Sequence, residues 1–242
     1  DDLERLAGLH DGSNIAAVIV EPVAGSAGVL PPPVGYLERL REICDKHGIL
    51  LIFDEVITAF GRVGKAFAAE RFDVMPDIIT TAKGLTNGVI PMGGVLVRDH
   101  VYDAFMQGPD YMIELFHGYT YSGHPVAAAA GLAAMDVYDE EGIFEQSLAL
   151  EKPFEELLHS FADHDKVIDV RNFGLMGAIE MAPRKGAPGA RGLETHKRCF
   201  WEEKLMVRNG MDILSFSPFL NSKLDDWNKA FDSVRRVIDS ID

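Results

Sequence analysis

An aspartate and a lysine each follow a short apolar run that is typical of a buried strand. Asp54 comes directly after Ile-Leu-Leu-Ile-Phe at 49–53, and Lys83 follows Ile-Ile-Thr-Thr-Ala at 78–82. Ligands of parallel sheets bind at the carboxyl ends of the strands. The two residues are roughly thirty positions apart, the length of one strand–helix–strand unit, so we expect them at neighbouring strand ends.

Either residue alone has an ordinary explanation, since an aspartate after a strand often caps a turn and a lysine there usually lies in solvent. Together they indicate a specific chemistry. A lysine whose pKa is lowered by desolvation and nearby positive charge can form a Schiff base. A carboxylate can keep a pyridine nitrogen protonated, as pyridoxal phosphate enzymes require. We therefore predict a pyridoxal phosphate site built on Lys83 and Asp54.

The first half of the chain alternates between apolar runs and helical patterns. This alternation predicts a parallel α/β unit. The strands are expected at 15–20, 49–53, 78–82 and 93–97, and the helices at 36–46 and 124–140.

The pattern changes after Glu141-Gly142. Longer charged helices and shorter strands predict an α+β unit, so we expect domains at 1–142 and 143–242. The helices are expected at 143–164, 194–205 and 224–241, the strands at 167–170, 177–180 and 213–216, and a Pro/Gly/Arg-rich loop at 182–192.

Composition excludes several classes of partner. A formal net charge of −15 and a pI near 4.9 argue against nucleic acid and against an anionic membrane surface. The apolar stretches fall short of the roughly 20 residues that a transmembrane helix needs. Cys44 and Cys199 are too few for a disulfide framework, which favours the cytoplasm. We assign no metal ligand.

The stretches around Asp54 and Lys83 resemble the class III, or ω-type, aminotransferases. The resemblance is carried by Asp-Glu-Val-Ile-Thr-Ala-Phe-Gly-Arg at 54–62 and by Pro-Asp-Ile-Ile-Thr-Thr-Ala-Lys-Gly at 76–84. It continues through 20–23, 118–125 and 208–218, and so covers nearly the whole chain. It implies a fold type I pyridoxal phosphate transferase. The chain would be the C-terminal part of its large, mostly parallel-sheet domain, followed by the small α+β C-terminal domain.

The resemblance implies a role for each matching position. Asp54 would pair with the pyridine nitrogen, and Val56, on the same strand face, would pack against the ring. Lys83 would form the Schiff base and move a proton between substrate and cofactor. Thr120 would reach the phosphate of the neighbouring subunit's cofactor in a homodimer or dimer of dimers. Arg208 would bind a substrate carboxylate through two parallel hydrogen bonds.

Other features favour one branch of the family. The stretches 117–125, 187–191 and 219–223 look most like β-alanine:pyruvate and ω-amino acid:pyruvate transaminases. Ser26 stands at a position that resembles a glutamate in the ornithine and γ-aminobutyrate relatives. That glutamate neutralises the arginine that corresponds to Arg208. A serine cannot do so, and the resemblance therefore implies that Arg208 stays available for pyruvate. Ile57 replaces a glutamine that some relatives aim at the cofactor. We expect transamination from an ω-amino acid or amine, such as β-alanine, to pyruvate, giving the semialdehyde or ketone and alanine.

Two other interpretations stay open. In the first interpretation, the protein is another class III enzyme. It would be an aminotransferase for amines, diamines or 4-aminobutyrate, or an aminomutase of the glutamate-1-semialdehyde type. Alternatively it is a catalytically inert fragment that acts as a binding or assembly module, because the family's phosphate cradle lies before the matched region. The sequence also departs from the family at Ala59 and Met211, where glycine is usual. A methionine at a positive φ would be strained, or its loop re-routed.

Overall fold

The computed structural model describes residues 2–112 and 115–242, which form two compact units. Unit 1 consists of Asp1–Pro22, Pro33–Phe60 and Phe67–Glu141, and unit 2 of Val23–Pro32, Gly61–Ala66 and Gly142–Asp242. Two short segments from the first half of the chain therefore pack with the second half. Within the described ranges, none of the helices combines the length and apolar character needed to cross a bilayer.

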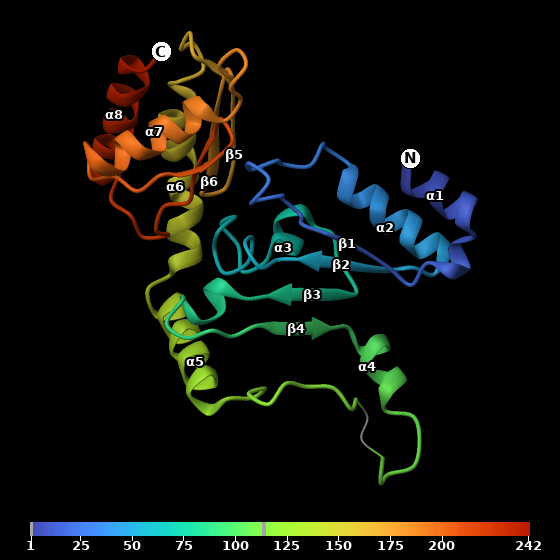
Figure 1. Ribbon diagram of the computed structural model, residues 1–242. Helices are drawn as coiled ribbons and strands as arrows, with labels where there is room; N and C mark the ends of the chain where they lie inside the picture. The colour runs from blue at the N-terminus through green and yellow to red at the C-terminus, as the bar shows by residue number, and fades with distance from the viewer. Residues whose placement is uncertain (1, 113–114) are drawn as a thin grey trace. The chain divides into compact units, whose positions relative to one another are not determined.

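Unit 1 is built on a four-stranded sheet with the order β1 (Ala17–Val20), β2 (Leu50–Asp54), β3 (Ile78–Thr81) and β4 (Gly94–Val97). The first three strands are parallel and β4 is antiparallel, as the arrows for β2, β3 and β4 show in Figure 1. The register places Asp54 opposite Thr80. The carboxyl ends of β2 and β3 therefore lie at one edge of the sheet.

The helices of unit 1 follow from apolar spacing and from tertiary partners. In α2 (Tyr36–His47), Leu37, Leu40 and Ile43 are buried, and Gly48 ends the helix in a left-handed conformation. The core under this helix also contains Leu51 and Phe53 of β2. The remaining helical segments are α1 (Asp2–His10), η1 (Gly12–Asn14), α3 (Ala68–Phe72), η2 (Lys83–Thr86), α4 (Asp99–Phe105) and α5 (Pro125–Glu140).

Unit 2 has its own antiparallel sheet with the strand order β5-β6-β8-β7. Aromatic side chains fill its core. The Phe154 ring contacts Trp227 and Phe231, and the Phe231 ring also contacts Phe161. The elements are α6 (Ile143–His159), β5 (Val167–Phe173), β6 (Met176–Met181), α7 (Ala190–Trp201), β7 (Arg208–Gly210), β8 (Ile213–Phe216) and α8 (Leu224–Ser240).

The predicted strands and the predicted α/β class are found, but the short helices α3 and α4 were not predicted, and three further helices differ from expectation. The helix predicted at 143–164 ends at His159, where the Ser160 hydroxyl donates to the Leu157 carbonyl and turns follow. The helix predicted at 194–205 runs from Ala190 to Trp201, because the distant Asp212 carboxylate accepts amides at its first turn. Helix α1 was not predicted.

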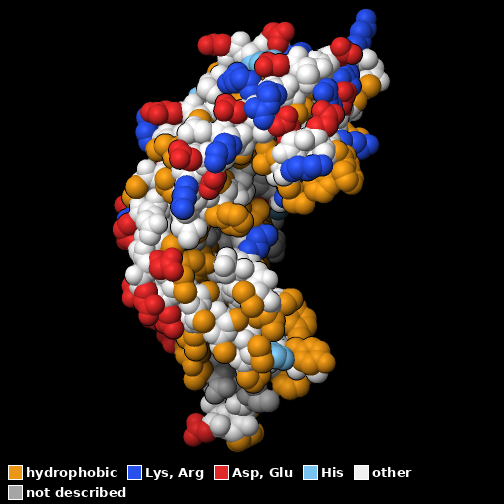
Figure 2. Space-filling view, turned by 90° about the vertical axis from the view of Figure 1, so that its left-hand side faces the viewer, with side chains coloured by type: hydrophobic (Ala, Val, Ile, Leu, Met, Phe, Trp, Pro, Cys, Tyr) orange, Lys and Arg blue, Asp and Glu red, His pale blue; other side chains and the backbone are white. Residues whose placement is uncertain are grey.

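Exposed apolar side chains are numerous in unit 1. They form much of the orange surface in the lower half of Figure 2. Monomeric proteins rarely expose large contiguous apolar patches, so such surface is typical of regions that other protein covers. The exposed residues include Val95, Leu96 and Val97 on β4, Tyr119 and Tyr121 before α5, and Val126, Leu132, Met135 and Val137 on α5.

Candidate active site

Asp54 and Lys83 lie at neighbouring strand ends, as their spacing predicts. Asp54 is the last residue of β2, and Lys83 follows β3 after Ala82. The β2–β3 ladder extends one step beyond Asp54, because the Glu55 amide donates to the Thr80 carbonyl at 2.9 Å. This backbone bond fixes the turn after β2 beside the segment that carries Lys83.

Asp54 retains acceptor capacity at this edge. Its side chain is half-buried, and its Oδ1 accepts the Val56 amide at 3.1 Å. Val56 therefore lies in a turn rather than on the strand face where we expected it, because this bond reverses the chain directly after β2. The bond uses one of about four acceptor positions on the carboxylate.

Glu55 has a function in the structure that the sequence did not indicate. Its carboxylate is fully buried and accepts the Ala68 amide at 2.6 Å, the Ala69 amide at 3.0 Å and the Thr58 hydroxyl at 3.0 Å. Burial raises its pKa, although these three donors act in the opposite direction. Glu55 thus ties the turn after Asp54 to the start of α3, through contacts that no local pattern predicts.

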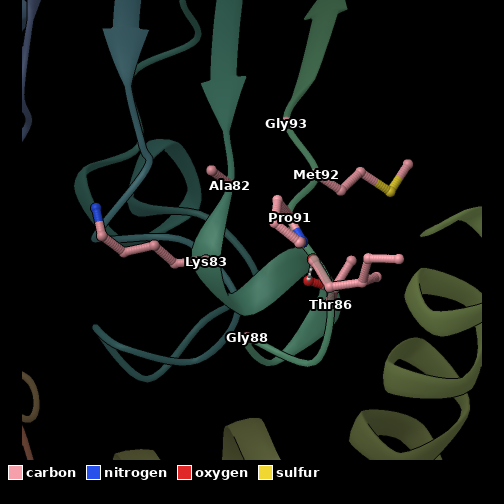
Figure 3. Close-up of a pocket in the computed structure, with 8 residues that line it drawn as sticks. Ala82, Lys83, Thr86, Gly88, Pro91, Met92 and Gly93 are labelled. Atoms are coloured by element: carbon pink, nitrogen blue, oxygen red, sulfur yellow. Dashed lines mark hydrogen bonds between the residues drawn. The ribbon is translucent and has the colours of Figure 1, made fainter. Parts of the chain in front are cut away.

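Lys83 has an unusual backbone conformation. Its φ is 45°, in the left-handed region that L-residues rarely adopt, and it opens η2. The residue is exposed and borders an open hollow of about 590 Å³ that is also lined by Thr86, Pro91 and Met92. Figure 3 shows the Lys83 side chain extending away from Pro91 and Met92, so its amino group lies outside that hollow.

Thr120 lies in an exposed loop before α5. The loop turns tightly, because the Ser122 amide donates to the Tyr119 carbonyl at 2.9 Å and the Tyr119 amide donates to Ser122 Oγ at 2.8 Å. Tyr119 and Ser122 line a second hollow, of about 650 Å³, that also borders Thr80 and Thr81. The structure places Thr120 on the surface rather than beside the hollow that Lys83 borders.

Arg208 belongs to unit 2 and is exposed. It opens β7 and pairs with Ser215 of β8, in the extended chain that follows the end of α7 at Trp201. The hairpin turn between the two strands contains Met211, whose φ is 54°. The predicted departure from glycine therefore leaves the methionine in a left-handed conformation.

Asp212 stabilises this hairpin turn. The residue is 5% exposed, and its carboxylate accepts the Gly189 amide at 2.6 Å and the Gly192 amide at 2.9 Å. A Cβ on Gly192 would lie 2.1 Å from the Met211 carbonyl oxygen, so the turn and the start of α7 are in direct contact. The strand that begins with Arg208 is thus attached to a rigid helix start.

Ser26 also belongs to unit 2, in the segment Val23–Pro32. Arg171 Nε donates to the Gly28 carbonyl at 2.9 Å and to the Val29 carbonyl at 3.0 Å. The same guanidinium pairs with Asp169 and Glu180. The two residues expected near the substrate carboxylate, Ser26 and Arg208, therefore belong to one unit, while Asp54, Val56, Lys83 and Thr120 belong to the other.

The donor set of unit 1 fits a pyridoxal group. An exposed amine and a half-buried carboxylate with free lone pairs stand at neighbouring strand ends, which suits an aldehyde at one side of a pyridine ring and a ring nitrogen at the other. The first amides of α3 already donate to Glu55 and offer no phosphate cradle. Within residues 2–112 and 115–242, no cluster of three or more His, Cys, Asp or Glu side chains could hold a metal ion.

Comparisons with known proteins agree on one family. The family described as "Aminotransferase class-III" matches residues 1–238. An omega-aminotransferase of Caulobacter vibrioides is 57% identical over 242 residues, which is 100% of this chain and 55% of that protein. A beta-alanine–pyruvate aminotransferase of Pseudomonas aeruginosa is 51% identical over 243 residues, or 100% of this chain and 54% of that protein. The chain spans about half the length of the curated relatives it matches.

Solved structures give the same result for the fold. An amine transaminase from an uncultivated Pseudomonas species in a PLP-bound form has a TM-score of 0.90 and 36% identity, and covers 98% of this chain and 55% of its own. The omega transaminase of Pseudomonas jessenii in complex with PMP has a TM-score of 0.90 and 31% identity, with 98% of this chain and 53% of its own covered.

Proposed function

Because the chain belongs to the class III aminotransferases, we propose that Asp54 and Lys83 form the cofactor centre of a pyridoxal phosphate-dependent transaminase. The reaction moves an amino group from an ω-amino acid or amine, such as β-alanine, to pyruvate. The observation that carries this proposal is the amine and the half-buried carboxylate at the neighbouring ends of β2 and β3.

The chain's residues divide the chemical work. Bound pyridoxal phosphate supplies an electron sink for the substrate carbon. Asp54 stabilises a protonated ring nitrogen with the lone pairs that its bond to Val56 leaves free. Lys83 Nζ would hold the group covalently and would serve as the base that moves a proton at the substrate carbon. Val56, in the turn beside Asp54, packs against one side of the ring.

Two residues of unit 2 bear on the substrate class. Arg208 presents an exposed guanidinium on β7, which can bind a carboxylate by donating two parallel hydrogen bonds. Ser26 carries no charge, so it leaves that guanidinium available for the carboxylate of pyruvate. The names of the similar proteins, which include pyruvate as amino acceptor, support the same assignment.

We propose a homodimer or a dimer of dimers as the working form. Thr120 stands on an exposed loop, where its hydroxyl can reach the phosphate of a neighbouring subunit's cofactor. Exposed apolar side chains on the same loop and on α5 support a protein partner there. Cys44 and Cys199 are buried and unpaired, which supports the cytoplasm as the compartment.

The proposal is tested by adding pyridoxal phosphate and recording the absorbance between about 400 and 430 nm, where a lysine-linked cofactor absorbs. Borohydride reduction followed by peptide mass spectrometry then locates the linkage. We expect a yellow protein whose cofactor is fixed to Lys83, no linkage in Lys83→Ala, and full linkage in Lys185→Ala, which removes an exposed lysine of unit 2.

Donor screening with pyruvate completes the test. Alanine formation from β-alanine supports the proposed substrate pair, whereas alanine from putrescine or another amine alone would assign a different class III donor. A protein that acquires no linked cofactor, or that acquires it equally in Lys83→Ala, would overturn the proposal and leave a binding or assembly role.

A further inference from the structure

The left-handed backbone at Lys83 requires something to stabilise it. This conformation is unfavourable for an L-residue, and it persists at functional sites only where surrounding contacts determine it. Two amides contribute: the Asn87 amide donates to the Gly84 carbonyl at 3.1 Å, and the Gly88 amide donates to the Lys83 carbonyl at 3.3 Å. Both bonds lie within η2 and its cap, and do not fix this short segment to the rest of unit 1.

A side chain of α5 supplies the tertiary contact. The Tyr138 hydroxyl donates to the Gly84 carbonyl at 2.7 Å, so this carbonyl accepts two hydrogen bonds, from Tyr138 and from the Asn87 amide. Gly84 is the residue directly after Lys83. The Tyr138 hydroxyl thus binds the Gly84–Leu85 peptide group, the second peptide group after the left-handed lysine.

Phe60 connects the same contact to the turn that carries Asp54. A Cβ placed on Gly84 would lie 2.8 Å from Phe60 Cβ, so Phe60 packs directly against the Gly84 backbone. The Phe60 and Tyr138 rings stack with their centroids 6.0 Å apart and an interplanar angle of 19°. Phe60 lies in the turn segment that begins after Asp54, and it is itself left-handed with a φ of 57°.

We propose that Tyr138 is a positioning residue for Lys83, which holds the lysine-bearing turn against the Asp54-bearing turn through Gly84 and Phe60. This inference rests on the proposed function for its catalytic meaning, since Lys83 must meet a cofactor whose ring nitrogen faces Asp54. The hydroxyl fixes the direction in which the Lys83 side chain leaves the backbone, and Phe60 fixes the spacing of the two turns.

The test uses Tyr138→Phe, which removes the hydroxyl and keeps the ring that stacks on Phe60. We expect the formation of the yellow, borohydride-trapped adduct at Lys83 to slow by roughly three- to tenfold, the factor that one hydrogen bond supplies. Tyr102→Phe is the matched control, because Tyr102 is half-exposed on α4, at the opposite edge of the sheet, and adduct formation should stay unchanged.

A second readout needs no cofactor. Hydrogen exchange of the Asn87 and Gly88 amides, followed by NMR, reports opening of the turn that contains Lys83. We expect exchange of these two amides to accelerate by roughly tenfold in Tyr138→Phe, with no change at the β2 amides. A general loss of stability would instead accelerate both sets.

The outcomes separate the two hypotheses. Adduct formation at the unaltered rate in Tyr138→Phe, or unaltered exchange at Asn87 and Gly88, overturns the inference about Tyr138. Absence of any Lys83 adduct in the unsubstituted protein overturns the proposed function, while the exchange measurement still decides the structural claim. Should Tyr138→Phe fail to fold, Phe60→Leu keeps the hydroxyl, removes the stacked ring, and should slow adduct formation in the same direction.

Discussion

The two edges of the unit 1 sheet each carry an aspartate beside an apolar strand, and the two carboxylates have opposite surroundings. Asp77, before β3, is 5% exposed and accepts the Leu51 amide and Arg41 Nη1, both at 2.7 Å. His100 Nε2 lies 3.3 Å from its other oxygen. Asp54, after β2, is half-buried and accepts the Val56 amide within its own turn.

The difference teaches how a structural carboxylate can be told from one that is available to a ligand. Asp77 joins α2, β2 and α4, and its oxygens are used by groups from each of them. Asp54 makes a local bond that orients it and leaves most of its acceptor positions free. Adjacent sequence does not separate the two cases, because both aspartates border runs rich in isoleucine and leucine.

The largest effect is expected from breaking the amino edge. Asp77→Ala leaves the Leu51 amide without its acceptor and the Arg41 guanidinium with only the exposed Asp45, and should lower the free energy of unfolding by about 3 kcal/mol. Urea unfolding measures this. Asp45→Ala is the control, since Asp45 pairs with the same arginine but is 67% exposed, and should cost less than about 1 kcal/mol. Equal losses in the two variants would contradict the comparison.

The second effect is expected at the carboxyl edge, on binding rather than on stability. Asp54→Asn keeps an acceptor for Val56 but loses the charge, so the free energy of unfolding should change by less than about 1 kcal/mol. The affinity for pyridoxal phosphate should fall by roughly tenfold or more, as expected for a charge-assisted hydrogen bond. Absorbance titration measures the affinity. A variant that unfolds readily but binds as before would reverse the roles assigned to the two edges.

A pH titration of stability sharpens the contrast. Burial, the largest influence, raises the pKa of Asp77, but the Leu51 amide and Arg41 outweigh it and hold the pKa below its usual value. The stabilisation is therefore complete above the unfolded pKa of about 3.9 and is lost as the pH falls through the folded pKa. Glu55 has the opposite sign, because its raised pKa gives stability below about pH 4.3 that declines as the pH rises.

Urea unfolding between pH 6 and pH 3 compares the unsubstituted protein with Asp77→Asn, and the Asp77 carboxyl should add a loss of stability as the pH falls. The loss should be smaller in Asp77→Asn, which has no carboxyl to protonate at the amino edge. An unchanged slope in this variant would mean that other acids determine the acid sensitivity.

The smallest effect is expected in unit 2, where the buried Asp212, like Asp77, uses its oxygens within the protein: they accept the Gly189 and Gly192 amides. Met211→Gly removes the strain of a left-handed methionine, and the side chain is 63% exposed, so little packing is lost. Thermal unfolding should show a gain of about 0.5 kcal/mol. Met206→Gly, at an exposed position with a negative φ, should destabilise instead.

The sequence predicted the larger helices and every strand except the short β7, because their apolar spacing is local. It missed α1, a nine-residue helix whose Glu4 pairs with Lys46 and His47 of α2, because short helices depend on tertiary partners. Partners distant along the chain also explain the early start of α7 at Asp212 and the burial of Glu55 under α3.

The candidate site divides in the same way. Strand ends and family resemblance located Asp54 and Lys83, because the sheet register follows from the apolar runs. The same evidence placed Val56 on a strand, and this placement was wrong, whereas the strand that carries Arg208 was not predicted. Neither turn geometry after Asp54 nor the extended path after Trp201 has a signal in residue type. Tyr138 was missed because its acceptor is a backbone carbonyl, which every residue carries.

The interleaving of the two units has an evolutionary consequence. The chain passes from one unit to the other at 22–23, 32–33, 60–61, 66–67 and 141–142. A break at residue 142 would separate the larger part of unit 2 from Arg62, which also belongs to unit 2. The Arg62 side chain donates to the Leu175 and Pro218 carbonyls, and its carbonyl accepts the Leu175 amide. No single crossover between genes can therefore exchange one unit intact, and a crossover at residue 142 would leave the unit 2 segments Val23–Pro32 and Gly61–Ala66 behind.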